Sequence, residues 1–274
     1  MKITEYAPGV PCWVDLSTPD LEASKAFYGE LFGWEARTSP DPNAGRYTFF
    51  VQDGREVAAA APMMGEGEPP AWSCYVSVCD ATETARVVEK LGGKVLAAPM
   101  EVLGQGTLAV LSDPDGAAFS VWQPDTFAGA GLVNEPNSFC WSELATRDPQ
   151  GARRFYPQVF GWGEQTSAYG ESTYTEFSVG RRTIGGMMAL DAEMPPAVPS
   201  HWLVYFAVAD AKATALKARD LGATQLMPLM EIEIGPSGRE RQDSPSGRER
   251  QSGRFTTLAD PQGANFAVIQ LTGA

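Results

Sequence analysis

Residues 11–34 read PCWVDLSTPDLEASKAFYGELFGW, and residues 139–162 read FCWSELATRDPQGARRFYPQVFGW. The two stretches align without a gap at an offset of 128, which places Trp13 opposite Trp141. Both contain a phenylalanine–tyrosine pair and end in glycine–tryptophan. The chain therefore repeats a long segment of itself, and this repeat is the strongest guide to its fold.

Two later segments repeat in the same order. WSCYVSVCD (72–80) corresponds to WLVYFAVAD (202–210), and SDPDGAAFSVWQ (112–123) corresponds to ADPQGANFAVIQ (259–270). A repeat of this period has the size of a domain and is too long for a solenoid. We expect two homologous domains at residues 1–127 and 137–274, joined by a linker at residues 128–136.

Each domain is predicted to contain two strand–helix–strands units. In residues 10–18 apolar and polar side chains alternate, as they do in a strand with two distinct faces. Pro19 and Asp20 favour the start of a helix, and Gly33 favours its end. Asp53 and Gly54 indicate a tight hairpin turn between the next two strands.

The two domains differ by an insertion before residue 260, because the offset rises there from 130 to 147. The added residues contain PSGRERQ twice, at 236–242 and 245–251. Small and charged residues without apolar anchors predict a mobile surface loop at about residues 235–253. A recent neutral duplication and a lid over a pocket are both consistent with this pattern.

Composition narrows the class of protein. With 274 residues and a formal net charge of -13, the chain is large enough for two cores and would repel nucleic acid. No apolar run reaches the roughly 18 residues of a membrane span, and the N-terminus lacks the apolar part of a signal peptide. The four cysteines show no metal-type spacing. We expect a cytoplasmic protein with neither nucleic-acid nor membrane partners.

The repeated segments, in this order, resemble the glyoxalase/bleomycin-resistance/dioxygenase superfamily, also called the vicinal oxygen chelate (VOC) superfamily. The resemblance covers nearly the whole chain, once per domain. It implies an α+β fold of two tandem VOC domains, each a pair of βαβββ modules that curl into a half-barrel around a cavity. Four modules in one chain look like the usual two-chain dimer fused into one, so we expect a monomer or a weak homodimer.

Members of this superfamily usually bind a metal in the cavity, but the corresponding positions here are poor ligands. The resemblance places these positions at Trp13, Ser73, Ser120, Trp141, Leu203 and Ala267. A divalent site requires imidazole, thiolate or carboxylate groups, and His201 is the only histidine. We therefore expect no metal and no cofactor, which disfavours glyoxalase I and extradiol dioxygenase activities.

The superfamily register instead predicts two cavities with aromatic walls and one carboxylate each. The expected ligand-binding residues are Trp13, Asp15, Met63, Ser73, Tyr75, Ser120 and Trp122 in the first domain, and Trp141, Glu143, Met187, Leu203 and Tyr205 in the second. The tryptophans could also be core residues. The carboxylates could be salt-bridge partners of Arg37, Arg46 or Arg55.

Two functional hypotheses follow from these residues and the resemblance. The first is a metal-independent binding protein that sequesters an aromatic, cationic natural product, with an anthracycline-like ligand. Its role would be antibiotic resistance or assistance to a biosynthetic tailoring oxygenase. The second is a metal-free enzyme of the same fold, such as an isomerase, cyclase, hydrolase or hydroxylase-pathway enzyme, with Asp15 or Glu143 as general base. Binding is favoured because we identify no acid–base or nucleophile–base pair.

Overall fold

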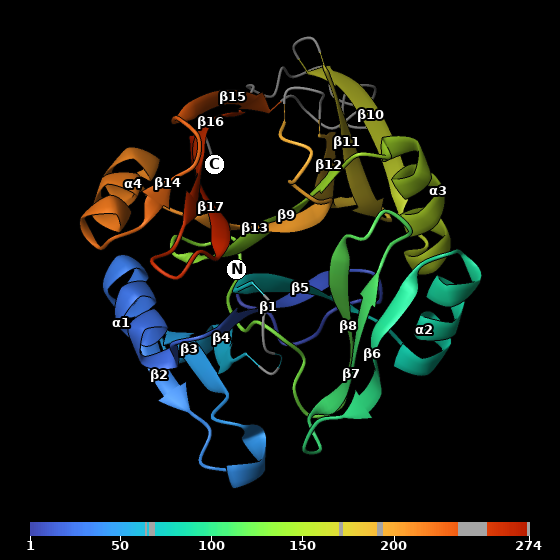
Figure 1. Ribbon diagram of the computed structural model, residues 1–274, viewed down its shortest axis with the longest axis horizontal. Helices are drawn as coiled ribbons and strands as arrows, with labels where there is room; N and C mark the ends of the chain where they lie inside the picture. The colour runs from blue at the N-terminus through green and yellow to red at the C-terminus, as the bar shows by residue number, and fades with distance from the viewer. Residues whose placement is uncertain (64, 66–68, 170–171, 191–193, 235–250, 273–274) are drawn as a thin grey trace.

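The computed structural model describes residues 1–63, 65, 69–169, 172–190, 194–234 and 251–272. The described residues form two mixed β-sheets with four α-helices outside them, which confirms the predicted α+β fold of two tandem domains (Figure 1). In Figure 1 the first sheet curves around the lower half of the molecule and the second around the upper half. Their central strands lie back to back in the middle, where β5 and β13 are in contact.

The first sheet has the order β2-β3-β4-β1-β5-β8-β7-β6. Strands β1 and β5 are antiparallel and join two modules, each of which closes with a parallel pair, β1–β4 or β5–β8. Its strands are β1 (Pro11–Thr18), β2 (Glu35–Thr38), β3 (Thr48–Gln52), β4 (Arg55–Pro62), β5 (Ala71–Ser77), β6 (Lys94–Glu101), β7 (Gly106–Ser112) and β8 (Ala118–Pro124). Its helices are α1 (Leu21–Phe32), α2 (Ala81–Lys90) and the short 3-10 helix η1 (Pro42–Ala44).

The second sheet repeats this plan in the order β10-β11-β12-β9-β13-β17-β16-β14, with β15 also paired to β16. Its strands are β9 (Ser138–Thr146), β10 (Gly163–Tyr169), β11 (Ser172–Val179), β12 (Arg182–Ala189), β13 (His201–Ala207), β14 (Thr224–Gln225), β15 (Met230–Ile234), β16 (Gln251–Ala259) and β17 (Asn265–Thr272). Its helices are α3 (Pro149–Phe160) and α4 (Ala211–Asp220). Most of the predicted 235–253 loop lies outside the described residues, and 251–253 belong to β16.

The repeated sequence contains the signals that begin and end the helices. Asp20 caps α1 by accepting a hydrogen bond from the Ala23 N–H at 3.0 Å, and Gly33 ends the helix with a φ of 76°. Asp148 and Gly161 do the same for α3. At 12 residues these are the longest helices of the described part, where no helix is long and apolar enough to cross a membrane.

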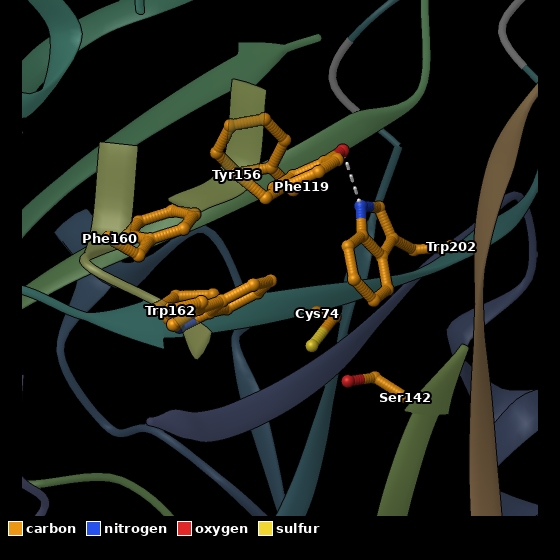
Figure 2. Close-up of a pocket in the computed structure, with 8 residues that line it drawn as sticks. Cys74, Phe119, Ser142, Tyr156, Phe160, Trp162 and Trp202 are labelled. Atoms are coloured by element: carbon orange, nitrogen blue, oxygen red, sulfur yellow. Dashed lines mark hydrogen bonds between the residues drawn. The ribbon is translucent and has the colours of Figure 1, made fainter. Parts of the chain in front are cut away.

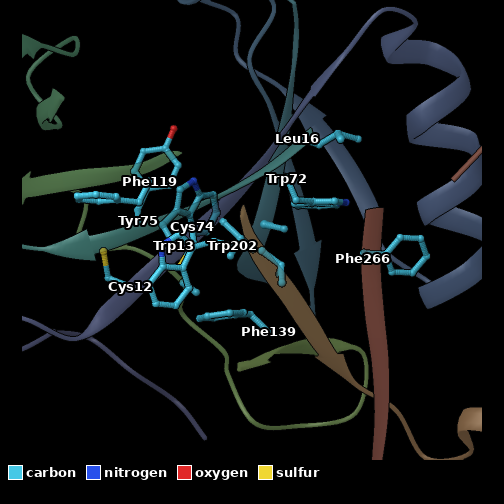
Figure 3. Close-up of a cluster of buried hydrophobic side chains, with 14 of the residues drawn as sticks. Cys12, Trp13, Leu16, Trp72, Cys74, Tyr75, Phe119, Phe139, Trp202 and Phe266 are labelled. Carbon is cyan, nitrogen blue, oxygen red and sulfur yellow. The ribbon is translucent and has the colours of Figure 1, made fainter. Parts of the chain in front are cut away.

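The tyrosine of the repeated phenylalanine–tyrosine pair connects the domains. The fully buried Tyr28 hydroxyl accepts a hydrogen bond from Trp72 Nε1 at 2.9 Å and donates one to Asp260 Oδ2 of the second domain at 3.0 Å. In the equivalent network the Tyr156 hydroxyl accepts from Trp202 Nε1 and donates to Asp113 Oδ2 of the first domain. Figure 3 shows part of the continuous apolar cluster around these groups, which contains residues of both domains. The motif that identifies the repeat therefore also joins its two copies.

A small void of about 10 Å³ lies between the domains. Cys74 and Phe119 line it from the first domain, and Ser142, Tyr156 and Trp202 are among the lining residues from the second (Figure 2). It has the size of about one water molecule and cannot hold an organic ligand. Because Val14 pairs with Cys74 across β1 and β5, this face of β1 is directed toward the second domain.

Candidate functional site

The opposite face of β1 holds a buried carboxylate. Asp15 is 8% exposed, and its Oδ2 accepts hydrogen bonds from the hydroxyls of Tyr75 at 2.7 Å and Tyr47 at 3.0 Å. The Tyr47 hydroxyl in turn accepts a hydrogen bond from Trp13 Nε1 at 2.8 Å. The β1–β5 register places Trp13 opposite Tyr75 and Asp15 opposite Ser73, so these side chains share one face of the sheet.

The second domain repeats this network with a longer acid. Glu143 is also 8% exposed, and its two oxygens accept hydrogen bonds from Tyr205 and Tyr174, both at 2.8 Å. Trp141 Nε1 donates to the Tyr174 hydroxyl at 3.0 Å. Strand β12 places Gly186 beside Glu143, where an added Cβ would lie 1.9 Å from the Tyr174 hydroxyl. The absence of a side chain at Gly186 therefore makes room for the tyrosine.

Neither carboxylate takes part in an ion pair among the described residues. Arg37 pairs with Glu35 and Arg46 with Glu22, both on the surface. Burial raises the pKa of Asp15 to about 6 and outweighs the lowering effect of the hydrogen bonds from its two tyrosines. Burial also raises the pKa of Glu143. Among the residues that the structure describes, the hydrogen-bond donors to each acid are thus tyrosine hydroxyls.

The raised pKa of Asp15 predicts a pH-dependent effect on stability. The folded protein keeps a proton that the unfolded chain, with a pKa of 3.8, releases. The stabilisation from this group is therefore fully present below pH 3.8 and is lost as pH rises through about 6. Asp15→Asn mimics the neutral acid, so at pH 8 its free energy of unfolding should exceed the wild-type value by about 1–3 kcal/mol.

Urea denaturation at pH 8 and near pH 4 would measure this difference, which should shrink at the lower pH. Asp125→Asn is the matched control, because Asp125 is exposed and its change should have little effect at either pH. An Asp15→Asn protein that is less stable than wild type at pH 8 would show that the ionised form is the favoured one.

The side chains at the positions that the resemblance assigns to metal ligands, which include Ser73 and Ser120, make a poor set of ligands for a divalent metal. Trp13 uses its only ring N–H to donate to Tyr47, and Leu203 and Ala267 have no donor atoms. Within the described parts of the chain, no three His, Cys, Asp or Glu side chains lie close enough to hold an ion. His201 is partly buried at the start of β13, and its Nδ1 lies 2.8 Å from the Pro199 carbonyl oxygen.

Most of the residues expected at the cavities lie around the two carboxylates. In the first domain Tyr75 of β5 pairs with Ser120 of the neighbouring strand β8, and Ser77 pairs with Trp122. In the second domain Leu203 lies opposite Glu143, and Tyr205 lies opposite Trp141. Met63 is partly buried just after β4, where its N–H bonds the Thr18 carbonyl oxygen.

Met187 does not share the face of Glu143, contrary to its predicted place among the ligand-binding residues. It is level with Leu144 on β9, is 2% exposed, and belongs to the main core. Met188 is 39% exposed and lies opposite Tyr174, so Met188 shares the face of Glu143. The correction follows from the alternation of side chains along a strand, which places adjacent methionines on opposite faces.

Sequence reasoning missed the second tyrosine of each network. Tyr47 begins YTFF (47–50) and Tyr174 begins YTEF (174–177), so the chain repeats this element as well. That recurrence was a usable signal, although neither segment is linked to its carboxylate by proximity in the sequence. The partners of Asp15 and Glu143 are therefore tyrosines, and the salt bridges considered from the sequence do not form with Arg37 or Arg46.

The fold and the repeated sites agree with the comparison to known proteins. The model of the Glyoxalase/Bleomycin resistance protein/Dioxygenase superfamily matches residues 12–121 and 138–268. The chain belongs to this superfamily. It is 37% identical to the "Anthracycline biosynthesis protein DnrV" of Streptomyces peucetius, over 98% of this chain and 96% of that protein. It is 39% identical to the "Putative glyoxylase CFP32" of Mycobacterium tuberculosis, over 98% and 97%.

Solved structures with a similar fold include a glyoxalase with bound Mn(II) and a dioxygenase. The Mn(II)-bound glyoxalase from Novosphingobium aromaticivorans is 15% identical, with a TM-score of 0.62 over 96% of this chain and 82% of that one. The 2,2',3-trihydroxybiphenyl 1,2-dioxygenase of Sphingomonas wittichii is 14% identical, with a TM-score of 0.61 over 97% and 91%. At these identities the likeness concerns the fold alone.

Proposed function

We propose that this protein is a metal-independent binding protein for an aromatic, cationic natural product. Its role would be sequestration of that compound, either in antibiotic resistance or as an accessory to a biosynthetic tailoring oxygenase. The observation that carries the proposal is the buried carboxylate of each domain, held by two tyrosine hydroxyls and next to a tryptophan that donates to one of them. The relatives named for anthracycline biosynthesis support an anthracycline-like ligand.

The chemistry of the site favours a ligand that combines a flat ring system with a protonated amine. An amine that enters the site gains a charge-assisted hydrogen bond to the carboxylate, worth about 1.5–3 kcal/mol. The indole faces of Trp13 or Trp141 add stacking and cation–π attraction. Because Asp15 and Glu143 form no ion pair among the described residues, such a ligand would supply the missing positive charge.

The test compares an anthracycline that carries a free amino sugar with its N-acetylated, neutral analogue. Titration by quenching of tryptophan fluorescence should show binding of both to the wild-type protein. The double variant Asp15→Asn/Glu143→Gln should bind the amine about ten- to hundred-fold more weakly and the neutral analogue almost unchanged. Equal weakening of both compounds, or no effect on either, would contradict the role of the carboxylates.

A metal-free enzyme remains the second candidate, because a buried acid with a pKa of about 6 is suited to accept a proton near neutral pH. Chromatography of the ligand after incubation separates the two functions. A binding protein returns the compound unchanged. An enzyme forms product at a rate that falls in Asp15→Asn or Glu143→Gln and rises with pH near the pKa of the base.

The proposal also predicts independence from divalent metals. Trp13, Leu203 and Ala267 stand at superfamily ligand positions and offer no lone pair for an ion. Elemental analysis of untagged protein should find no stoichiometric Zn, Ni, Mn or Fe, and EDTA should leave ligand affinity unchanged. A full-occupancy metal whose removal abolishes binding would overturn the proposal.

A further inference from the structure

In the first domain a phenylalanine of the same chain occupies the space in front of the carboxylate network. The Phe127 ring packs edge-on against Trp13 at 5.0 Å between centroids, and against Phe49 at 5.7 Å. Trp122 lies 6.2 Å from the same ring and donates from Nε1 to the Phe127 carbonyl oxygen at 2.8 Å. Trp13 is only 3% exposed and Trp122 only 6%. The aromatic surfaces expected to receive a ligand are already covered.

The backbone around Phe127 is anchored to the first sheet. The Phe127 N–H bonds the Gln105 carbonyl oxygen at 3.2 Å, and the Ala130 N–H bonds the Cys12 carbonyl oxygen at 2.8 Å. Ala130 is 1% exposed, so this part of the predicted linker is packed against the domain. The backbone is therefore anchored at Phe127 and at Ala130, and the Phe127 side chain packs against the continuous apolar cluster.

The second domain lacks two of the aromatic rings that close the first. In the first domain Phe49 pairs with Ala59, which in turn pairs with Asp15. In the second domain Glu176 takes the place of Phe49, because it pairs with Gly186, the strand neighbour of Glu143. The strand registers also place Ile269 where the first domain has Trp122. At these two positions the second domain therefore carries a polar and a smaller apolar side chain in place of the rings that pack on Phe127 in the first.

Two side chains near Glu143 are also more exposed than their counterparts near Asp15. Trp141 is partly buried, whereas its counterpart Trp13 is 3% exposed. Met188 is 39% exposed, and Ala61 at its counterpart position is partly buried. Leu203, Tyr205, Ala267 and Ile269 form an apolar cluster of their own, separate from the main core that contains Trp13 and Trp122. Phe255 contributes a ring here, but it packs on Tyr205 at 6.0 Å.

We infer that the cavity of the second domain is the ligand-binding one, and that Phe127 occupies the equivalent place in the first. The ligand class, a planar aromatic cation, rests on the proposed function. The choice of cavity rests on the packing of Phe127 and on the exposure of Trp141. Glu143 is then the carboxylate that meets the ligand, and Asp15 is an internal remnant of the same arrangement.

The test uses proflavine, a planar aromatic cation, with binding followed by equilibrium dialysis. Wild-type protein should bind one equivalent. Glu143→Gln should weaken binding at least ten-fold and by a larger factor than Asp15→Asn, while the exposed control Asp125→Asn should leave it unchanged. Phe127→Ala should open a second site that Asp15→Asn removes, whereas the bulkier Phe127→Leu should keep a single site. Binding that depends on Asp15 and not on Glu143 would overturn the choice of cavity and leave the proposed function intact.

A second measurement needs no ligand and covers the case in which Phe127→Ala fails to fold. Acrylamide should quench part of the wild-type tryptophan fluorescence, and Trp141→Phe should remove much of that quenchable part. Trp122→Phe, which removes a covered tryptophan of the first domain, should not reduce it. Quenching unchanged by Trp141→Phe would show a closed second cavity and overturn the inference. Absence of proflavine and anthracycline binding despite a quenchable Trp141 would instead refute the proposed function.

Discussion

Replacement of Tyr156 by phenylalanine should lower the free energy of unfolding by about 2–4 kcal/mol, because two buried polar groups lose their partner at once. Its hydroxyl accepts a hydrogen bond from Trp202 Nε1 at 3.0 Å (Figure 2). It donates one to Asp113 Oδ2, also at 3.0 Å, and Tyr156 is fully buried. The phenylalanine ring would still fill the space. The loss therefore reports these two hydrogen bonds, of which the one to Asp113 crosses between the domains.

Tyr28→Phe should lower the free energy of unfolding by a similar amount, since Tyr28 lies between Trp72 and Asp260 in the equivalent network. Chemical denaturation followed by fluorescence and by circular dichroism would measure both variants. Arg86→Gln serves as control: it breaks an exposed ion pair with Glu83 and should change stability by less than about 0.5 kcal/mol. If both tyrosine variants fall within the range of that control, the interdomain networks do not stabilise the fold.

Gly129→Ala should destabilise the protein more than either tyrosine change, with an expected loss of about 3–5 kcal/mol in the free energy of unfolding. Gly129 has a φ of 123°, a conformation that residues with a side chain rarely adopt. An added Cβ would also lie 2.3 Å from the Cys12 carbonyl oxygen, which belongs to the backbone of β1 and cannot move aside easily. The change should lift the segment that carries Phe127 away from Trp13.

Gly131→Ala is the matched control two residues later. An added Cβ there would lie 3.3 Å from its nearest neighbour, the Arg55 Cβ, and the φ of Gly131 is not in the left-handed region. We expect a loss below about 1 kcal/mol there. Thermal unfolding of both variants would show the difference, and acrylamide quenching of Gly129→Ala should rise as Trp13 becomes exposed. Equal stability of the two variants would contradict the close packing of the 127–130 segment.

Much of the fold could be predicted from local signals. The Asp53–Gly54 turn has positive φ at both residues, as the hairpin prediction requires, and the helices of the repeat end at Gly33 and Gly161. Strands β2 and β10 carry no comparable local signal. Both lie at sheet edges and are largely exposed, so burial imposes little apolar alternation on them.

The candidate site was predictable only in part, for a geometric reason. Alternation along β1 placed Trp13 and Asp15 on one face, and the structure has them there. The tyrosine that joins them, Tyr47, comes from the distant β3 region, so its distance to Asp15 depends on how the sheet curls. Met187 shows the limit of the pattern, because the neighbouring Met188 reads equally well as an inward residue until the register of β12 is known.

The sequence by itself determined the duplicated architecture, the superfamily and the presence of one acidic residue on the first strand of each domain, at Asp15 and Glu143. These properties reside in repeated local motifs that neighbouring residues encode. Tertiary structure alone decided that the acids are held by tyrosines, that Tyr28 and Tyr156 join the domains, and that Phe127 covers Trp13. Each of these depends on contacts between segments far apart in the chain, whose distances are set by the curvature of the sheets and by the way the two domains pack.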